Sequence, residues 1–307
     1  LGGGNGKLAV TLNAATDAAV DLTSIGGDAL NSVTVADNLT FTGTLDDAVA
    51  TTVANGVTLT TTAAKATGKV INEAAETNAT TAITALHSTV SANLGGIATN
   101  SVTAAATVAT DAAVNFLGTL GKAVVTVTGG DGGGNDIFNV NGATMNTSSF
   151  VVNGNAVLQG TALKLDGVAV SGTGTTAVTA LHSTVGADLS GLTSTTVTAA
   201  ATATNATISF TGSLGKAVVA ITGGDGAGND IFNVNGATMG TAAFTVAENN
   251  TLQGTALKLD GVTASGAGTT AVTALHSTAG ADLSGLTTTS VTAAATATNA
   301  TISFTGS

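Results

Sequence analysis

The chain has 307 residues, of which 43% are hydrophobic and only 8% are charged, and its formal net charge is -11 at pH 7. It contains no Pro, Cys, Trp, Tyr or Arg, so every basic residue is a Lys. The lack of Cys excludes disulfides, thiol catalysis and thiolate metal sites. The acidic balance disfavours nucleic acid as a partner, because affinity for phosphate backbones needs clustered Lys and Arg.

The mean hydropathy of +0.44 is high for a composition with so many polar residues. Thr, Gly, Asn or Asp nevertheless interrupts every apolar stretch before it reaches the length of about 18 residues that a membrane-spanning helix needs. The sequence therefore predicts no membrane span, and it places the hydrophobic residues in buried strands.

The first 119 residues resemble shortened copies of a unit that recurs later in the chain. SVTVADNLTFTGTL at Ser32 to Leu45 parallels TVTAAATATNATISFTGSL at Thr196 to Leu214. We therefore divide residues 1–119 into two divergent, shortened repeat units, 1–43 and 44–119.

Two full repeats follow, at 120–213 and 214–307, each 94 residues long and alignable without an insertion. Their differences cluster where FVVNGNAVL at Phe150 to Leu158 becomes FTVAENNTL at Phe244 to Leu252. This clustering predicts a solvent-facing loop whose side chains do not decide the fold. Because the chain starts and stops where a copy does, we expect it to continue in kind beyond both ends or to meet neighbouring molecules there.

Most of each repeat reads as β-strand. Thr, Val, Ile and Phe alternate with small residues in VTAAATAT, ATISFTG, KAVVAITG, DIFNVNG, AFTVAE and ALKLDG, which is the period of a pleated strand. Two of these segments end in the tight-turn dipeptides Asn235-Gly236 and Asp260-Gly261. Such dipeptides favour two-residue hairpins and hence antiparallel neighbours.

Two segments have a helical alternative. INEAAETNATTAITAL, which starts at Ile71, contains better helix formers and predicts a helix of two or three turns. In TTAVTALHSTVGADLSGL, the residues Val178, Leu181, Val185 and Leu189 have helical spacing. The β-branched content of this second segment favours a buried strand equally, so both interpretations remain open.

These elements predict an all-β fold of tandem antiparallel β-sandwich (Ig-like) repeats of about 94 residues, since eight short strands per repeat match the size of such a domain. A parallel β-solenoid is the alternative, because chains rich in Gly, Asn and Thr often form one. Solenoid coils usually repeat every 20 to 50 residues, and the 94-residue repeat contains no evident sub-period of that size.

Each full repeat carries one glycine- and aspartate-rich turn, GGDGGGNDIF from Gly129 and GGDGAGNDIF from Gly223. The turn resembles the calcium-binding nonapeptide of RTX proteins. Its oxygen-bearing side chains suit a hard cation that takes six to eight oxygen ligands, which makes calcium the candidate cofactor. A glycine-rich turn without an ion is the competing interpretation. The candidate metal ligands are Asp131, Asn135, Asp136, Asp225, Asn229 and Asp230.

The three histidines, His87, His182 and His276, recur in the same ALHST context. Only Asp188 and Asp282 follow at a fixed distance, and nothing lies at the spacing of a zinc motif. We therefore expect each histidine to pack beside a strand or short helix. No nucleophile elbow, P-loop or aromatic sugar platform accompanies them, so the sequence predicts no catalytic residues and no enzymatic activity.

Threonine alternation in VTAAATAT also suggests an ice-binding face. Regular ranks of Thr-x-Thr on successive coils are not evident in the sequence, so this interpretation has little support from the sequence alone.

The composition as a whole, together with the GGDGxGND turns, resembles bacterial surface-layer proteins and repetitive RTX-type surface adhesins. The resemblance implies an extracellular structural protein of the cell surface that binds calcium. From it we expect copies of the chain to self-assemble into a filament, sheath or S-layer-like lattice, with cell-surface glycans as a further partner. The alternative is the stalk of a large secreted adhesin.

Overall fold

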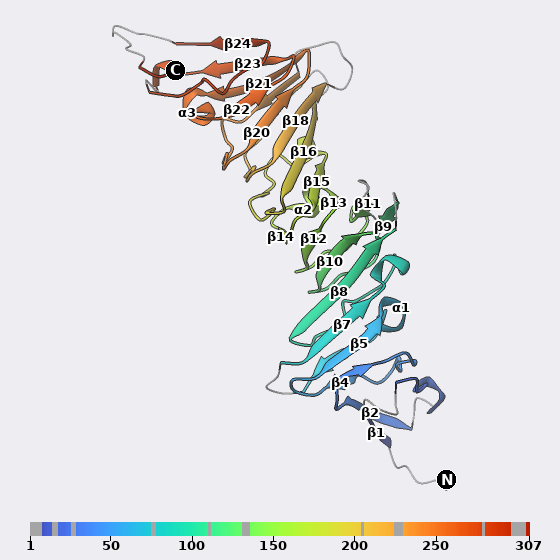
Figure 1. Ribbon diagram of the computed structural model, residues 1–307. Coiled ribbons are helices and arrows are strands. Elements are labelled where there is room, and N and C mark those ends of the chain that lie inside the picture. Colours follow the sequence, from blue (N-terminus) through green and yellow to red (C-terminus); the bar gives the residue numbers. More distant parts are fainter. Residues whose placement is uncertain are drawn as a thin grey trace. The chain divides into compact units, whose positions relative to one another are not determined.

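A computed structural model describes residues 8–13, 18–25, 29–74, 78–109, 112–130, 136–203, 206–223, 230–277, 280–295 and 305–307. The chain divides into two compact units, unit 1 at 1–158 and unit 2 at 159–307 (Figure 1). The boundary lies inside the first full sequence repeat and within strand β13 (Ala156–Thr161).

Unit 1 consists almost entirely of short strands joined by turns. Its elements are β1 (Leu8–Leu12), η1 (Thr23–Ile25), β2 (Leu30–Val35), β3 (Leu39–Thr40), β4 (Thr51–Val53), β5 (Thr58–Thr62), α1 (Ala63–Ala66), β6 (Ile71–Glu73), β7 (Thr80–Thr84), η2 (Leu86–Ser88), β8 (Ser101–Val108), β9 (Ala113–Asn115), β10 (Val124–Gly129), β11 (Asp136–Asn139) and β12 (Ser149–Asn153).

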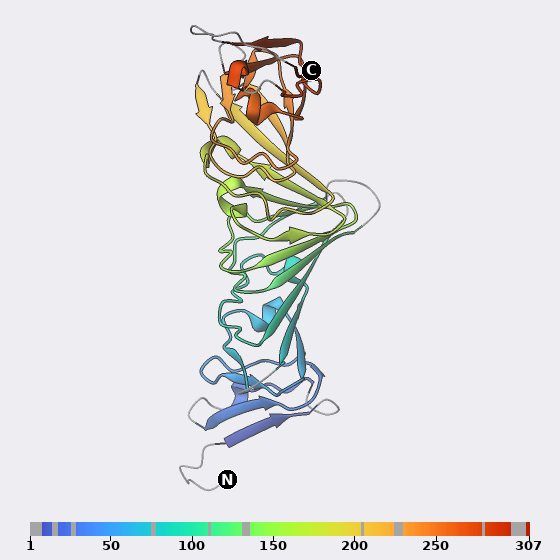
Figure 2. The same cartoon turned by 90° about the vertical axis from the view of Figure 1, so that its left-hand side faces the viewer.

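The strands of unit 1 form parallel ladders. One ladder joins β1, β2, β4 and β6 in that order. A second joins β3, β5, β7, β8, β10 and β12, and β9 pairs with β11. In Figure 2 the blue and teal strands of this unit lie one above another. The backbone therefore returns to the same side of the unit in the same direction after each turn, which is the geometry of a solenoid.

Unit 2 repeats this construction. Its elements are α2 (Ala162–Leu165), β14 (Val170–Ser171), β15 (Thr175–Thr179), η3 (Leu181–Ser183), β16 (Thr196–Ala203), β17 (Thr207–Ser209), β18 (Val218–Gly223), β19 (Asp230–Asn233), β20 (Ala243–Val246), β21 (Asn250–Thr255), α3 (Ala256–Leu259), β22 (Thr263–Ser265), β23 (Thr269–Thr273), η4 (Leu275–Ser277) and β24 (Ser290–Ala293). One parallel ladder joins β15, β16, β18, β20 and β22, and another joins β17, β19, β21, β23 and β24.

The prediction of antiparallel β-sandwich repeats is therefore wrong, and the parallel β-solenoid is the correct alternative. Successive rungs of a ladder lie 18 residues apart at Thr251 and Thr269 but 25 apart at Val218 and Ala243. About four such coils fill one 94-residue repeat, at a length within the usual range for solenoids. Because the coils differ in length and in sequence, no constant sub-period marks them.

The turn dipeptides have positions that explain the error. Asn235-Gly236 lies between β19 and β20, which belong to different ladders. Asp260-Gly261 follows the single turn of α3 rather than a strand, and Gly261 has the positive φ of 67° that often ends a helix. The predicted strand ALKLDG is thus a helical turn, capped by Thr255, whose side chain accepts a hydrogen bond from the Lys258 backbone N–H at 3.3 Å.

Three further local predictions can be compared with the structure. The helix predicted from Ile71 is wrong for the described residues of this segment, which form β6 and β7 and belong to two ladders. For TTAVTALHST, strand and helix were both left open, and the structure contains some of each. The segment begins as a strand (β15) and continues as a 3₁₀ turn (η3) after Ala180, whose φ is +52°. The window from Phe150 to Leu158 is not a solvent-facing loop, since it forms parts of β12 and β13 and buries Phe150, Val152 and Leu158.

The core is built from small aliphatic side chains and from larger side chains that stack on one another between coils. Phe116 stacks on Phe138 in unit 1 and Phe210 stacks on Phe232 in unit 2, with ring centroids 5.7 and 5.8 Å apart. Buried hydroxyls pair between coils in the same way, as between Thr270 and Thr288 at 2.8 Å. Each coil therefore places the same kind of side chain over that of its neighbour, which buries apolar area and satisfies the polar groups together.

Candidate functional site

The glycine- and aspartate-rich turns were the strongest candidates for a metal site. Asp131, Asn135, Asp225 and Asn229 lie outside the described residues. Asp136 and Asp230 are the first residues of β11 and β19, and both side chains are buried.

Both aspartates lie against the glycine that ends the preceding strand. A Cβ atom added to Gly129 would collide with Oδ2 of Asp136, and one added to Gly223 would collide with Oδ2 of Asp230. The glycine that ends the preceding strand therefore makes room for the carboxylate. In the first repeat the Gly130 backbone N–H donates to Oδ2 of Asp136 at 2.9 Å, whereas Oδ1 finds no hydrogen-bond partner among the described residues.

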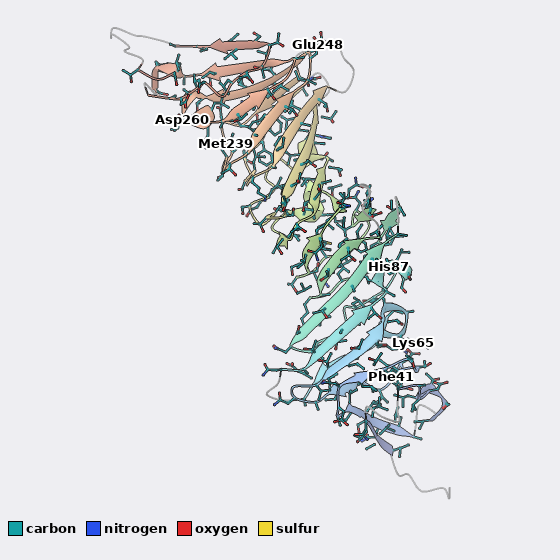
Figure 3. All side chains as sticks on the ribbon, in the orientation of Figure 1. Phe41, Lys65, His87, Met239, Glu248 and Asp260 are labelled. Carbon is teal, nitrogen blue, oxygen red and sulfur yellow. The ribbon has the colours of Figure 1, made fainter. Side chains whose placement is uncertain are left out.

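The second repeat adds an amide beside the carboxylate. Asn250 is the strand partner of Asp230, and its Nδ2 donates to the Glu248 carbonyl at 2.9 Å (Glu248 is labelled in Figure 3). A calcium ion takes six to eight oxygens, and the described residues hold no group of three or more His, Cys, Asp or Glu that could bind a metal. Calcium binding at these turns stays a prediction.

Two of the three histidines, His87 and His182, connect neighbouring coils. His87, labelled in Figure 3, lies in η2. Its Nδ1 accepts a hydrogen bond from the Thr107 backbone N–H at 3.1 Å. His182 occupies the equivalent place in η3 and accepts from the Thr202 N–H at 3.2 Å. An Nδ1 that accepts a hydrogen bond belongs to a neutral imidazole. These two side chains therefore secure a strand of the next coil, and their Nδ1 atoms are occupied by that contact.

Aspartates at one corner of unit 2 form a second set of contacts between coils. The Asp188 backbone N–H donates to Oδ1 of Asp166, and the Asp282 N–H donates to Oδ1 of Asp260, each at 2.7 Å. Sequence reasoning missed Asp166 and Asp260 in this role. The available signal was the Asp-Gly pair after ALKL, which was interpreted as a hairpin turn.

Hydrogen bonds also lower the pKa values of two of these carboxylates. The side chain of Ser190, its backbone N–H and the side chain of Ser213 hold the pKa of Asp188 below 3.8, against a smaller opposing effect of burial. The Ser284 side chain and N–H, with the Ser307 hydroxyl, do the same to the pKa of Asp282.

We expect Asp188→Asn to remove a pH-dependent part of the stability. A carboxylate whose pKa is lower in the folded than in the unfolded state stabilises the fold above its unfolded pKa, and this contribution disappears as the pH falls through the lower, folded value. In thermal unfolding followed by circular dichroism, the wild type should therefore lose its advantage over the variant as the pH falls below 3.8. Asn93, whose Oδ1 accepts from the Gly95 N–H at 3.0 Å, shows that an asparagine fits such a corner. A difference between the two proteins that stays constant with pH would contradict the assignment.

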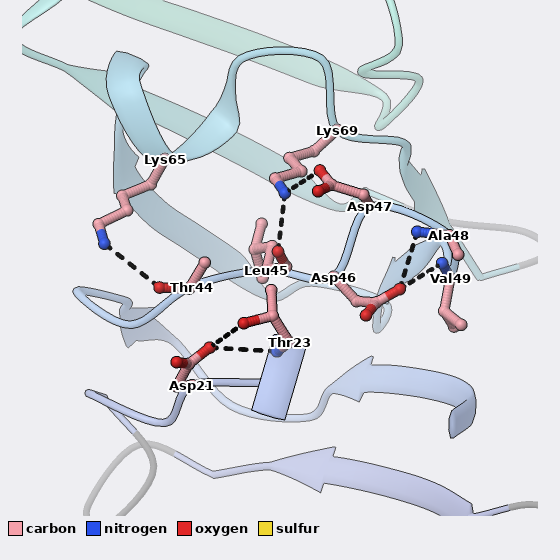
Figure 4. A network of polar contacts seen from close by, with 10 residues as sticks. All are labelled: Asp21, Thr23, Thr44, Leu45, Asp46, Asp47, Ala48, Val49, Lys65 and Lys69. Atoms are coloured by element: carbon pink, nitrogen blue, oxygen red, sulfur yellow. Dashed lines mark hydrogen bonds and ion pairs between the residues drawn. The ribbon is translucent and has the colours of Figure 1, made fainter. Parts of the chain in front are cut away.

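Lysines link two coils of unit 1 (Figure 4). Lys69 is 9% exposed, forms an ion pair with Asp47, and donates through Nζ to the Leu45 carbonyl at 2.8 Å. Lys65 donates to Oγ1 of Thr44 at 3.4 Å. The contact of Lys69 with a carbonyl and a carboxylate compensates for the burial of its ammonium group, and the arrangement ties residues 44–47 to the next coil.

Unit 2 contains an open pocket of about 510 Å³ between the 238–243 turn and α3. Met239, Leu257, Lys258 and Asp260 line it; Met239 and Asp260 are labelled in Figure 3. Lys258 already donates to the Ala237 carbonyl at 2.5 Å, and Asp260 already accepts the Asp282 N–H. The charged groups of the pocket are thus engaged in holding the coils together.

Comparison with known proteins adds no relative, since no family model, no curated protein and no solved structure matches the chain. Within the ranges that the structure describes, no helix has the length and apolar character needed to cross a membrane.

Proposed function

We propose that this chain is a non-enzymatic spacer, the repeat region or stalk of a large secreted surface protein of the adhesin kind. The observation that carries the proposal is the coil-on-coil ladder, in which Thr103 of β8 pairs with Val124 of β10 and Val124 pairs with Ser149 of β12. Each further coil adds about 4.8 Å to such a stack. A solenoid of this kind gains length by repeating a unit whose contacts are only to its neighbours.

The spacer is better supported than self-assembly into a filament, sheath or lattice. Self-assembly was expected from the resemblance to surface-layer proteins, and tandem β-sandwiches would favour it with a free strand edge in every repeat. In the solenoid, β8, β10, β16 and β18 are each paired on both sides. Secretion, calcium and contact with cell-surface glycans stay predictions within this proposal.

Removing residues 120–213 tests the proposal directly. The deletion joins Thr119 to Leu214, which is the equivalent of Leu120 at the start of the next copy. We expect the shortened chain to fold with an almost unchanged melting temperature, because each coil keeps a neighbour of similar sequence. Its maximum dimension in small-angle X-ray scattering should decrease by about 19 Å, which is four coils of about 4.8 Å.

An out-of-phase deletion of residues 120–203 is the matched control. It removes a similar length but leaves part of a coil without its counterpart, so we expect it to lose cooperative unfolding. If both deletions behave alike, or if the in-phase deletion leaves the maximum dimension unchanged, the coils do not act as interchangeable spacers.

A further inference from the structure

Each unit carries one sheet face whose outward side chains are small and rich in threonine. In the central strands β8 and β16, the outward residues include Thr103 and Thr198, both exposed. We call these surfaces the threonine faces. In unit 1 the face consists of Thr58, Thr60, Thr80, Ala82, Ser101, Thr103, Ala105, Thr107, Val124, Thr126, Thr128, Ser149, Val151 and Asn153. In unit 2 it consists of Thr175, Ala177, Thr196, Thr198, Ala200, Thr202, Val218, Ala220, Thr222, Ala243, Thr245, Thr263 and Ser265.

The ladder register aligns these residues across coils, although their spacing in the sequence is irregular. Thr58 lies opposite Thr80, and Thr107 lies opposite Thr128, with their Oγ1 atoms 3.3 Å apart. In unit 2 the Oγ1 atoms of Thr202 and Thr222 are 3.1 Å apart. The fold therefore brings threonines together in pairs, while other places in the same rows hold Ala, Val or Ser, as where Thr103 lies between Ala82 and Val124. In Figure 1 the arrows of β5, β7, β8 and β10 lie side by side and point in the same direction.

No position on either face is charged or aromatic. The charged side chains described above lie elsewhere: in turns and corners, as Lys69 and Asp188 do, in the helical turns α1 and α3, or buried at the start of β11 and β19. All seven phenylalanines among the described residues are buried, so neither face offers the aromatic platform that sugar rings favour. The chemistry that remains is a regular array of hydroxyl and methyl groups.

Such an array has the repeat distances of an ordered water layer. Neighbouring strands of a sheet lie about 4.8 Å apart, and outward residues of one strand lie about 6.6 Å apart. These distances are close to those between oxygen atoms on the surface planes of ice. Hydroxyl groups in rows can hold water at such sites, while the methyl groups between them disfavour liquid water.

We propose that the threonine faces bind ice. Neutral hydroxyls and methyls suit the uncharged surface of an ice crystal, whereas a lysine or a carboxylate would hold its own hydration shell and disrupt the lattice. The proposal concerns surface chemistry alone and does not depend on the spacer function.

The test uses the full chain, with serum albumin as a protein that does not bind ice. We expect the wild type to shape single ice crystals, to slow recrystallisation and to enter a slowly growing ice hemisphere. Thr103→Lys with Thr198→Lys places one charge at the centre of each face, and this variant should lose all three effects. The matched control is Thr147→Lys with Thr241→Lys, which adds the same charges at equivalent exposed turn positions outside the faces. This control variant should retain all three effects on ice. Circular dichroism melting of all three proteins checks that they fold equally well.

Several outcomes would overturn the proposal. The wild type could be excluded from ice as albumin is, the face variant could keep its activity, or the two lysine variants could lose it equally. Sedimentation velocity tests one more outcome that would overturn the proposal. If the wild type forms a dimer and the face substitutions dissociate it, the occupant of the face is a second copy of the chain and not ice.

Discussion

Phe210→Ala should lower the free energy of unfolding by about 3–5 kcal/mol, the usual cost of emptying a buried aromatic site. Phe210 is fully buried, its ring stacks on Phe232 of the next coil at 5.8 Å, and its backbone N–H donates to the Asn233 carbonyl at 2.8 Å. The backbone on both sides is held by the parallel ladders, so the coils cannot close readily around the cavity. Urea unfolding followed by far-UV circular dichroism measures the loss.

Leu257→Ala is the control for this prediction. Leu257 also loses a large apolar side chain, but it is 67% exposed on α3, so the change should stay within about 0.5 kcal/mol. The stacked pair Phe116 and Phe138 in unit 1 should repeat the result of Phe210. Equal effects of Phe210→Ala and Leu257→Ala would show that the stacked rings do not hold the coils together.

Gly212→Ala should be comparably severe. A Cβ atom at Gly212 would lie within 3.0 Å of the Ala187 carbonyl oxygen, which is main chain and cannot rotate away. The surrounding backbone is fixed on both sides. The Thr238 N–H donates to the Gly212 carbonyl at 2.9 Å, and the Gly212 N–H donates to the Val185 carbonyl at 3.0 Å. We expect a loss at or above the upper end of the range of about 1–3 kcal/mol for overpacked sites, measured by the same unfolding experiment.

Gly280→Ala separates the collision from the intrinsic effect of replacing glycine. A Cβ atom at Gly280 meets nothing within 4 Å, and its φ is not in the left-handed region. That substitution should leave the stability nearly unchanged. Gly118 in unit 1 has the same close contact with the Ala92 carbonyl, so Gly118→Ala should behave like Gly212→Ala. If Gly212→Ala and Gly280→Ala are equally mild, the corner is more deformable than its hydrogen bonds indicate.

The sequence allowed the strands to be predicted but not the way in which they pair. Alternation in KAVVAITG, DIFNVNG and AFTVAE predicts strands, and β18, β19 and β20 confirm them. The direction of pairing was predicted wrongly because Asn-Gly and Asp-Gly report only a backbone that tolerates positive φ. They do not report whether the next strand pairs with the last one or with a strand one coil away.

The candidate site shows a similar division. Alternation in DIFNVNG correctly placed Asp136 and Asp230 at the start of strands. Their burial against a glycine could not be foreseen, because turn residues of this kind are usually exposed. The pairing of Asp166 with Asp188, and of His182 with Thr202, depends on coils about 20 residues apart in the chain. Such contacts follow from the ladder register, which unequal coil lengths hide in a single sequence.

The near identity of the repeats 120–213 and 214–307 has a consequence for how the chain reaches its structure. During folding, a coil of one copy presents almost the same surface as the corresponding coil of the other, and docking errors between like modules are a characteristic hazard of repeat proteins. The copies diverge at Ala156 and Asn250, and Asn250 pairs with Asp230 in the β19–β21 ladder. Because Asp136 and Asp230 are the same in both copies, Asn250 in place of Ala156 is a buried polar difference that any pairing between coils of different copies would have to accommodate.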